Sequence, residues 1–255
     1  MNKKTILAVT FATLAFGQLA KAQTNIQLFY DFGSDRKQVT TTIEGFYNDN
    51  WGNTFFFVDH DFNHKSNDGT QGITGTYMEI ARCLNFWQNS KLAPLSLQVE
   101  YNGGVYKNYY INHSFLTGVD LFLHSADFNN TFNFKVLYKY ICQTTQKVPM
   151  QFTFVWGMQD LFGVKGLRFS GFADFWWENC AWTDPEGNTT KTSCVFISEP
   201  QLWYNIGSLF GCPNLNIGGE VEFAYNFAGG WRSDLEFHKN KGLTVAPAAG
   251  IKWVF

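Results

Sequence analysis

Three adjacent residues, Asp59, His60 and Asp61, carry side chains that could bind a metal ion or exchange protons. Carboxylates and an imidazole form such a site only if they converge on one point. In an extended strand, successive side chains point to opposite faces, so the two aspartates share a face and His60 points away unless a bulge intervenes. We therefore interpret the group as two carboxylates on one face of a strand and a histidine on the other.

The other candidate catalytic groups also argue against an enzyme. His113 and Ser114 are neighbours, so on a strand they point to opposite faces and cannot pair as base and nucleophile on one surface. The sequence contains no GxSxG, HExxH or glycine-rich phosphate loop. We predict that the protein is not an enzyme and that it needs no metal and no other cofactor.

The chain has five cysteines, so at least one is unpaired. Cys180 and Cys194 enclose a polar segment, residues 181–193, that has the composition of a loop. In an exported protein such a pair can close the loop with a disulfide, and the alternative interpretation is two free thiols. No CxxC and no Cys/His spacing indicates a metal site.

The elements that position these residues are predicted to be strands, and the last one is the clearest. Residues 244–255 alternate with a period of two: one face is apolar and ends in aromatic residues, and the other is mostly small and carries Lys252. This segment resembles the closing strand of a bacterial outer-membrane β-barrel.

The first 22 residues have the features of a secretory signal peptide. Lys3 and Lys4 precede an apolar run, residues 6–16, and Ala20-Lys21-Ala22 is a small-x-small cleavage site. We predict an exported mature chain of residues 23–255. Without the three lysines of this segment the chain keeps 16 basic and 21 acidic residues, a net charge of −5. That balance argues against a nucleic acid polymer as a partner.

The composition indicates a surface that faces lipid. Aromatic residues make up 18% of the chain, and charged residues only 16%, against about 25% in ordinary soluble domains. A membrane barrel can turn such rings outward to lipid, so we expect outer-membrane lipid around the protein. No window of about 18 apolar residues predicts a transmembrane helix. A soluble secreted barrel of the lipocalin type is the alternative, but it usually has only about eight strands.

Runs of about ten alternating residues, separated by Gly, Asn, Asp or Pro, recur along the mature chain. Nine are regular, residues 54–63 and 76–86 are less so, and the terminal strand makes twelve. The connections at the predicted periplasmic end are short, whereas residues 64–75, 179–198 and 227–244 form long polar connections at the other end. We predict an all-β, twelve-stranded antiparallel transmembrane β-barrel, residues 23–255, with short periplasmic turns and longer outer loops.

Several short stretches occur in order along these strands: Thr42-Ile43-Glu44-Gly45-Phe46, Tyr77-Met78-Glu79-Ile80, Glu100-Tyr101-Asn102-Gly103-Gly104, Gly171-Phe172-Ala173-Asp174-Phe175-Trp176, Glu199-Pro200-Gln201-Leu202-Trp203, Gly219-Glu220-Val221-Glu222 and Asn226-Phe227. Their order, with the aromatic end of the last strand, resembles the nucleoside-specific outer-membrane channel family (Tsx-like). The resemblance covers nearly all of the mature chain. It implies a twelve-stranded barrel that passes small solutes, which are nucleosides in the best-known members.

The alternation also predicts which side chains line the lumen: Glu44, Phe55, Phe57, Asp59, Asp61, Glu79, Lys135, Lys139, Arg168, Asp174, Trp203, Glu220, Glu222 and Lys252. Barrels of roughly eight strands are filled by side chains and those of 16–18 are open, so with twelve the inward residues decide what passes. Both charge signs are present, which suits zwitterionic or neutral polar solutes better than a strongly ion-selective pore. Inward aromatic rings could stack against a flat base or a sugar face.

The sequence therefore predicts a bacterial outer-membrane channel for passive uptake of small polar solutes, with nucleosides favoured by the resemblance. One alternative stays open: a closed outer-membrane barrel that acts as a binding or structural protein through its outer loops. The connection 179–198 is the candidate surface for that role. The inward charges would then be salt-bridged plugs, and the inward rings would be filler.

Overall fold

The computed structural model describes residues 22–33, 37–62, 72–106, 110–144, 146–178, 180–183, 189–192, 194–227 and 243–255. The strands are β1 (Ala22–Asp31), β2 (Val39–Asp49), β3 (Gly52–Phe62), β4 (Ile73–Leu84), β5 (Leu95–Tyr106), β6 (Tyr110–His124), β7 (Asn130–Ile141), β8 (Met150–Met158), β9 (Leu167–Trp176), β10 (Cys180–Thr183), β11 (Thr189–Thr192), β12 (Val195–Ser198), β13 (Gln201–Tyr204), β14 (Leu215–Tyr225) and β15 (Leu243–Val254). No helix in these ranges is both long enough and apolar enough to span a membrane. The predicted signal peptide lies outside them, except for Ala22, and stays a prediction.

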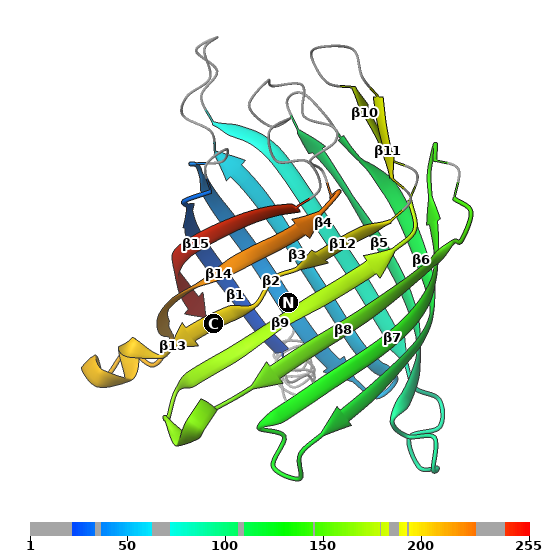
Figure 1. The fold of residues 1–255 in the computed structure, drawn as a ribbon. Coiled ribbons are helices and arrows are strands. Elements are labelled where there is room, and N and C mark those ends of the chain that lie inside the picture. Colours follow the sequence, from blue (N-terminus) through cyan, green and yellow to red (C-terminus); the bar gives the residue numbers. More distant parts are fainter. Residues whose placement is uncertain are drawn as a thin grey trace, which may run out of the picture.

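The main sheet closes into one antiparallel barrel (Figure 1). Strands β1 to β9 pair in sequence order, and β15 closes the ring because it pairs with both β14 and β1. β12 and β13 both lie between β9 and β14, so they are two parts of one barrel strand. Pro200, which has no N–H to donate, separates them without a change of register. The 13 strands of the sheet thus form a twelve-stranded barrel, which confirms the predicted fold class.

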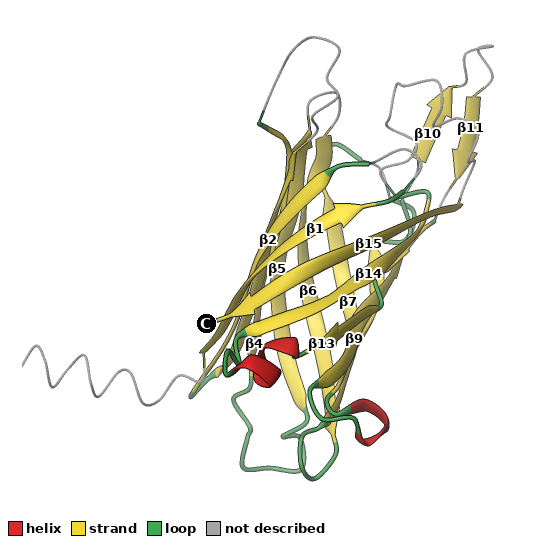
Figure 2. Cartoon of the chain, turned by 90° about the vertical axis from the view of Figure 1, so that its left-hand side faces the viewer, coloured by secondary structure: helices red, strands yellow, loops and turns green. Residues whose placement is uncertain are grey.

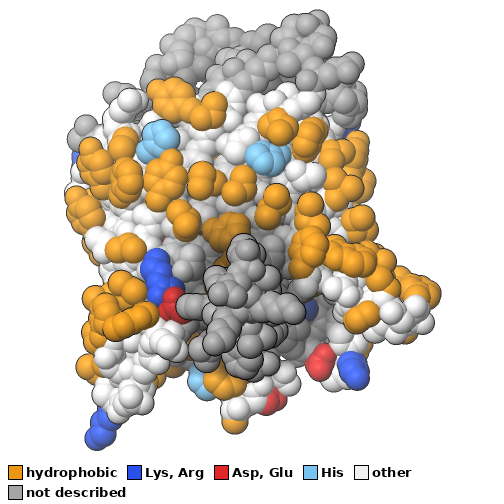
Figure 3. Space-filling view, turned by 180° about the vertical axis from the view of Figure 1, so that it is seen from behind, with side chains coloured by type: hydrophobic (Ala, Val, Ile, Leu, Met, Phe, Trp, Pro, Cys, Tyr) orange, Lys and Arg blue, Asp and Glu red, His pale blue; other side chains and the backbone are white. Residues whose placement is uncertain are grey.

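The barrel is apolar outside and polar inside. In β1, Ile26 and Leu28 are 42% and 44% exposed on the outer face, whereas Gln27 between them is 1% exposed on the inner face. The outer faces of the other strands carry exposed aromatic and aliphatic side chains in the same way. Figure 3 shows hydrophobic side chains spread over the outer surface, with most of the visible charged ones near its lower end. This arrangement is the reverse of a soluble barrel, which packs its apolar faces inward.

The two rims of the barrel differ. One, the turn rim, carries the connections 50–51, 85–94, 125–129, 159–166 and 205–214, together with the start of β1 and the end of β15. Two short 3-10 helices, η1 (Leu161–Gly163) and η2 (Ile206–Phe210), lie in its turns (Figure 2). The opposite rim, the loop rim, carries the hairpin β10–β11, which projects beyond the barrel wall (Figure 2). This hairpin lies within the connection 179–198, which the sequence analysis predicts to be a loop. Large parts of the other two predicted outer loops, 64–75 and 227–244, lie outside the described residues.

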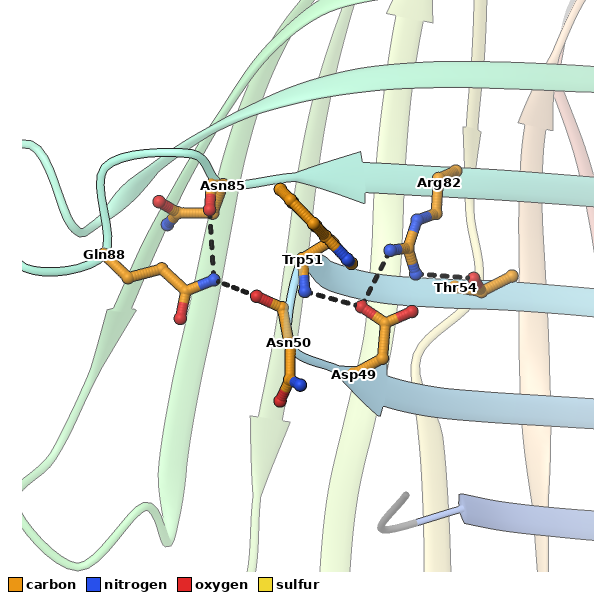
Figure 4. A network of polar contacts seen from close by, with 7 residues as sticks. All are labelled: Asp49, Asn50, Trp51, Thr54, Arg82, Asn85 and Gln88. Atoms are coloured by element: carbon orange, nitrogen blue, oxygen red, sulfur yellow. Dashed lines mark hydrogen bonds and ion pairs between the residues drawn. The ribbon is translucent and has the colours of Figure 1, made fainter. Parts of the chain in front are cut away.

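A polar network at the turn rim ties β2, β3 and β4 together (Figure 4). The Asp49 carboxylate accepts a 2.8 Å hydrogen bond from the Trp51 backbone N–H, and it lies 2.8 Å from Nη2 of Arg82. The other terminal nitrogen of Arg82 donates to Thr54 Oγ1 at 3.0 Å. The turn between β2 and β3 is thereby fixed to the next strand.

We expect Arg82→Gln to change the free energy of unfolding by less than about 1 kcal/mol. The Arg82 and Asp49 side chains are 25% and 50% exposed, and water screens a pair as exposed as this one. Urea titration of the refolded barrel in detergent micelles measures the change, with Asp49→Asn as the matched partner variant. A loss of several kcal/mol in either variant would contradict this assignment of a minor role.

Candidate functional site

All fourteen side chains predicted to line a lumen lie on the inner face of the barrel. Directly paired residues of neighbouring antiparallel strands share a face. Glu44 pairs with Phe57, and Phe57 pairs with Glu79, so one wall can be followed from β2 to β4. The same pairing connects the inner positions of the remaining strands. Contact of any of these residues with a solute stays a prediction.

The inner face is more acidic than the predicted set. Asp31, Glu100 and Asp120 also point inward, because they pair with Ala248, Ala81 and Ser96. All three lie on the polar side of an alternating run in the sequence, so the same rule could have added them to the predicted lumen residues. The inward acids within the described strands are ten: Asp31, Glu44, Asp59, Asp61, Glu79, Glu100, Asp120, Asp174, Glu220 and Glu222. The described inward lysines and arginines are four: Lys135, Lys139, Arg168 and Lys252.

The two signs are unevenly distributed around the barrel. Strands β1 to β6 contribute seven of the ten acids, and none of their described inward side chains is a lysine or an arginine. All four basic side chains come from three other strands: two from β7, one from β9 and one from β15. One half of the wall, β1 to β6, is therefore purely acidic, and the other half is mixed.

Hydrogen bonds from neighbouring strands hold the acidic wall in place. Thr42 and Thr40 of β2 donate to Asp59 and Asp61 of β3 at 2.5 and 2.7 Å. His60 lies on the outer face, where its Nδ1 is 2.9 Å from Thr76 Oγ1. The sequence-based interpretation of this group, two carboxylates on one face and the histidine on the other, is confirmed. Among the described residues no group of three His, Cys, Asp or Glu side chains is placed to hold a metal ion.

The basic side chains of the mixed wall rest on rings and amides. The Lys139 ammonium lies 3.8 Å from the centre of the Trp176 ring and donates to Gln151 Oε1 at 2.7 Å. The Lys252 ammonium lies 4.1 Å from the centre of the Trp203 ring. A cation over an aromatic face is attracted by the negative face of the ring, and this attraction strengthens when water is excluded. These two lysines are therefore fixed in the wall and are less free to reach a passing solute.

Tryptophan and phenylalanine fill the lumen near Lys252. Trp203 is among the largest fully buried side chains, and its ring centre lies 5.5 Å from that of Phe29. Both rings lie over glycines of the next strand: a Cβ at Gly218 would come within 2.8 Å of Trp203, and one at Gly250 within 2.7 Å of Phe29. Small residues at these two positions thus provide the room for the rings.

A second group of apolar side chains lies on the inner face toward the loop rim. Its buried members are Ile141, Trp176, Val195, Ile197 and Ala224, from β7, β9, β12 and β14. Phe172 and Phe227 pack against them. The sequence analysis did not identify Trp176, Phe227 or Tyr77 as lumen residues. We call this group, with Phe172 and Phe227, the loop-rim cluster.

The disulfide considered between Cys180 and Cys194 stays a prediction, because only one of the two side chains belongs to the described residues. Cys194 is half-buried. The β10–β11 register pairs Cys180 with Thr192, so Cys194 lies beyond the hairpin and not opposite Cys180. The Cys180 side chain itself lies outside the described residues.

One family model covers the whole described chain. Its description is a domain of unknown function (DUF5020), and it matches residues 22–255. The chain belongs to this family. A comparison with curated proteins gave no match for this DUF5020 chain.

The DUF5020 chain is similar in fold to solved outer-membrane porins. With the NanC porin it shares 8% sequence identity at a TM-score of 0.53, over 90% of this chain and 98% of that one. The KdgM porin gives 8% identity and a TM-score of 0.45, over 91% and 99% of the two chains. OpdK of Pseudomonas aeruginosa, solved with vanillate, gives 7% and 0.39, over 92% and 98%. At these identities only the NanC likeness carries weight, and it concerns the fold alone. None of these names mentions a nucleoside channel, so that finer resemblance stays a prediction.

Proposed function

We propose that the chain forms a passive channel for small polar solutes in the bacterial outer membrane. The observation that carries the proposal is the inverted closed barrel, with exposed apolar side chains outside and acids, amides and lysines inside. Such a surface is stable where hydrocarbon surrounds the barrel and water fills it. The porin-like barrel is typically not an enzyme, and we infer no catalytic activity.

The charge of the inner face supports a solute class. Within the described strands, ten inward acids face four inward basic residues, and two of the basic ones, Lys139 and Lys252, lie over tryptophan rings. Rings of carboxylates in a pore favour cations and reject anions. We therefore expect neutral and cationic polar solutes to pass more readily than anionic ones of the same size. This shifts the balance from the zwitterionic solutes that the sequence suggested toward cations.

Nucleosides are the leading neutral candidates because of the family resemblance in the sequence. Inward rings such as Phe55 and Phe57, whose centres are 6.0 Å apart, offer flat surfaces next to the carboxylates of the acidic wall. Bases stack on aromatic side chains with little dependence on sequence, and sugar hydroxyls can donate to carboxylates. This pairing supports nucleosides and sugars as solutes to be tested.

A reconstitution experiment tests the channel. Residues 23–255 are refolded and inserted into planar bilayers for conductance, and into liposomes for the flux of nucleosides, sugars and amino acids. We expect discrete conductance steps and measurable flux of neutral solutes, with empty liposomes and heat-unfolded protein as controls. A correctly folded barrel that shows neither conductance nor flux would contradict the proposed channel function.

The projecting β10–β11 hairpin favours one second function, that of a binding or structural barrel acting through its outer loops. Solute uptake by cells that lack the gene, compared with cells that carry the intact or a shortened gene, distinguishes a channel from a binding barrel. A channel predicts reduced solute uptake that is restored by the intact gene and equally by a version without residues 180–192. A binding barrel predicts unchanged uptake and a defect that the shortened version does not restore.

A further inference from the structure

A chain of aromatic rings crosses the interior of the barrel. The ring of Phe227 lies 5.7 Å from that of Trp176 on β9 and 6.5 Å from that of Tyr77 on β4. Tyr77 continues the row to Phe57 on β3 at 5.9 Å, and Phe55 follows at 6.0 Å. These separations and their tilted or edge-to-face angles are those of attractive aromatic contacts.

The row cannot follow the wall of the barrel. Four strands, β5 to β8, separate β4 from β9 on one side, and an even longer arc separates them on the other. Figure 1 shows β9 in the near wall and the strands around β4 in the far wall. Phe227 therefore lies inside the lumen and joins two distant parts of the wall.

The residues around Phe227 explain why it points inward. Asn226 has a positive φ of 61°, a left-handed conformation that asparagine tolerates better than most residues, and it turns the chain at the end of β14. Its side chain is 5% exposed and donates to the Cys194 carbonyl at 2.9 Å, next to the start of β12. Phe227 then packs against the buried members of the loop-rim cluster. A turn, a buried hydrogen bond and apolar packing thus fix one ring.

We infer that Phe227 is the constriction residue of the channel and sets the size limit for solutes entering from the loop rim. The inference rests on the proposed channel function. A ring anchored on Trp176 and reaching Tyr77 divides this part of the lumen, so a solute must pass beside it. The remaining passage is bounded by the aromatic row and by the carboxylates of the acidic wall, of which Glu79 accepts a hydrogen bond from Tyr77 at 2.6 Å.

The test compares two phenylalanines at the end of β14. Phe227→Ala removes the ring from the lumen, whereas Phe223→Ala removes one from the outer face, where Phe223 is 37% exposed. We expect Phe227→Ala to raise single-channel conductance at least about twofold, because the narrowest section of a pore dominates its resistance. It should also admit larger neutral polyethylene glycols. Phe223→Ala should conduct like the unmodified protein.

A cysteine variant provides the reverse change. Phe227→Cys should conduct more than the unmodified protein, and a bulky methanethiosulfonate reagent should then reduce its conductance. The unmodified protein, treated with the same reagent, controls for its own cysteines, of which Cys83, Cys142 and Cys212 are free thiols. Circular dichroism and heat-dependent electrophoretic mobility verify that each variant is folded.

The outcomes separate this inference from the proposed function. If the unmodified protein conducts and folded Phe227→Ala has the same conductance and size limit, the ring is filler and the inference is wrong. If the unmodified protein is silent and Phe227→Ala conducts, Phe227 closes the lumen and the inference stands in its strongest form. If both are folded and silent, the channel function fails and the inference fails with it.

Discussion

Neutralising Glu79, Glu100 and Asp174 together is expected to remove most of the preference of the channel for cations. Glu79 on β4 interacts electrostatically with Glu100 on β5 and with Asp174 on β9, so the field of these carboxylates reaches across the lumen. A unit charge 4 Å away changes the energy of a passing ion by about 1 kcal/mol even in bulk water. At alkaline pH, where all three carboxyls are ionised, the loss of three charges should therefore lower the ratio of potassium to chloride permeability severalfold.

The reversal potential in a steep potassium chloride gradient measures this ratio. The triple variant Glu79→Gln, Glu100→Gln, Asp174→Asn preserves side-chain shape and removes only charge. Asp127→Asn, in an exposed turn of the turn rim, is the control that should leave the ratio unchanged. The difference between triple variant and unmodified protein should also shrink at high salt, because ions screen the field. A preference for chloride in the unmodified protein would contradict the charge argument.

The wall of the barrel could be predicted from the sequence because its signal is local. Alternation fixes which side of a strand each residue faces, so Glu44, Asp59 and Lys135 were placed correctly without any knowledge of their neighbours. The same rule could have placed Glu100 and Asp120, which sit on the polar sides of their runs. Closure into a ring followed from the number of runs and from the amphipathic last strand.

Contacts across the lumen could not be predicted in the same way. Tyr77 and Phe227 are 150 positions apart in the chain and meet only because twelve strands close around them. Phe227 follows the alternating run of β14 and depends on the left-handed turn at Asn226, which no period reveals. The hairpin β10–β11 was missed for a related reason: its two strands have only four residues each, too few to show a period.

Truncation of Trp203 is expected to be the most destabilising single change in the barrel wall. The residue is 2% exposed and packs against Phe29, and its indole N–H donates to Gln201 Oε1 at 2.9 Å. Removing a buried tryptophan ring costs about 3–5 kcal/mol in well-packed interiors. Trp203→Ala also removes the aromatic face beneath the buried Lys252 ammonium, so the lysine loses its cation–π contact. Water entering from the lumen can fill part of the gap, so we expect a loss near the lower end, about 3 kcal/mol.

Urea unfolding of the refolded barrel, followed by its heat-dependent electrophoretic mobility, measures the loss in free energy of unfolding. Trp203→Phe keeps a ring over Gly218 and should recover most of the stability. Trp253→Ala is the matched control, because Trp253 lies on the outer face at 39% exposure and should cost less in detergent micelles. Equal unfolding midpoints for Trp203→Ala and the unmodified protein would mean that this ring does not support the wall. Both the packing argument and the idea that Gly218 makes room for the Trp203 ring would then be wrong.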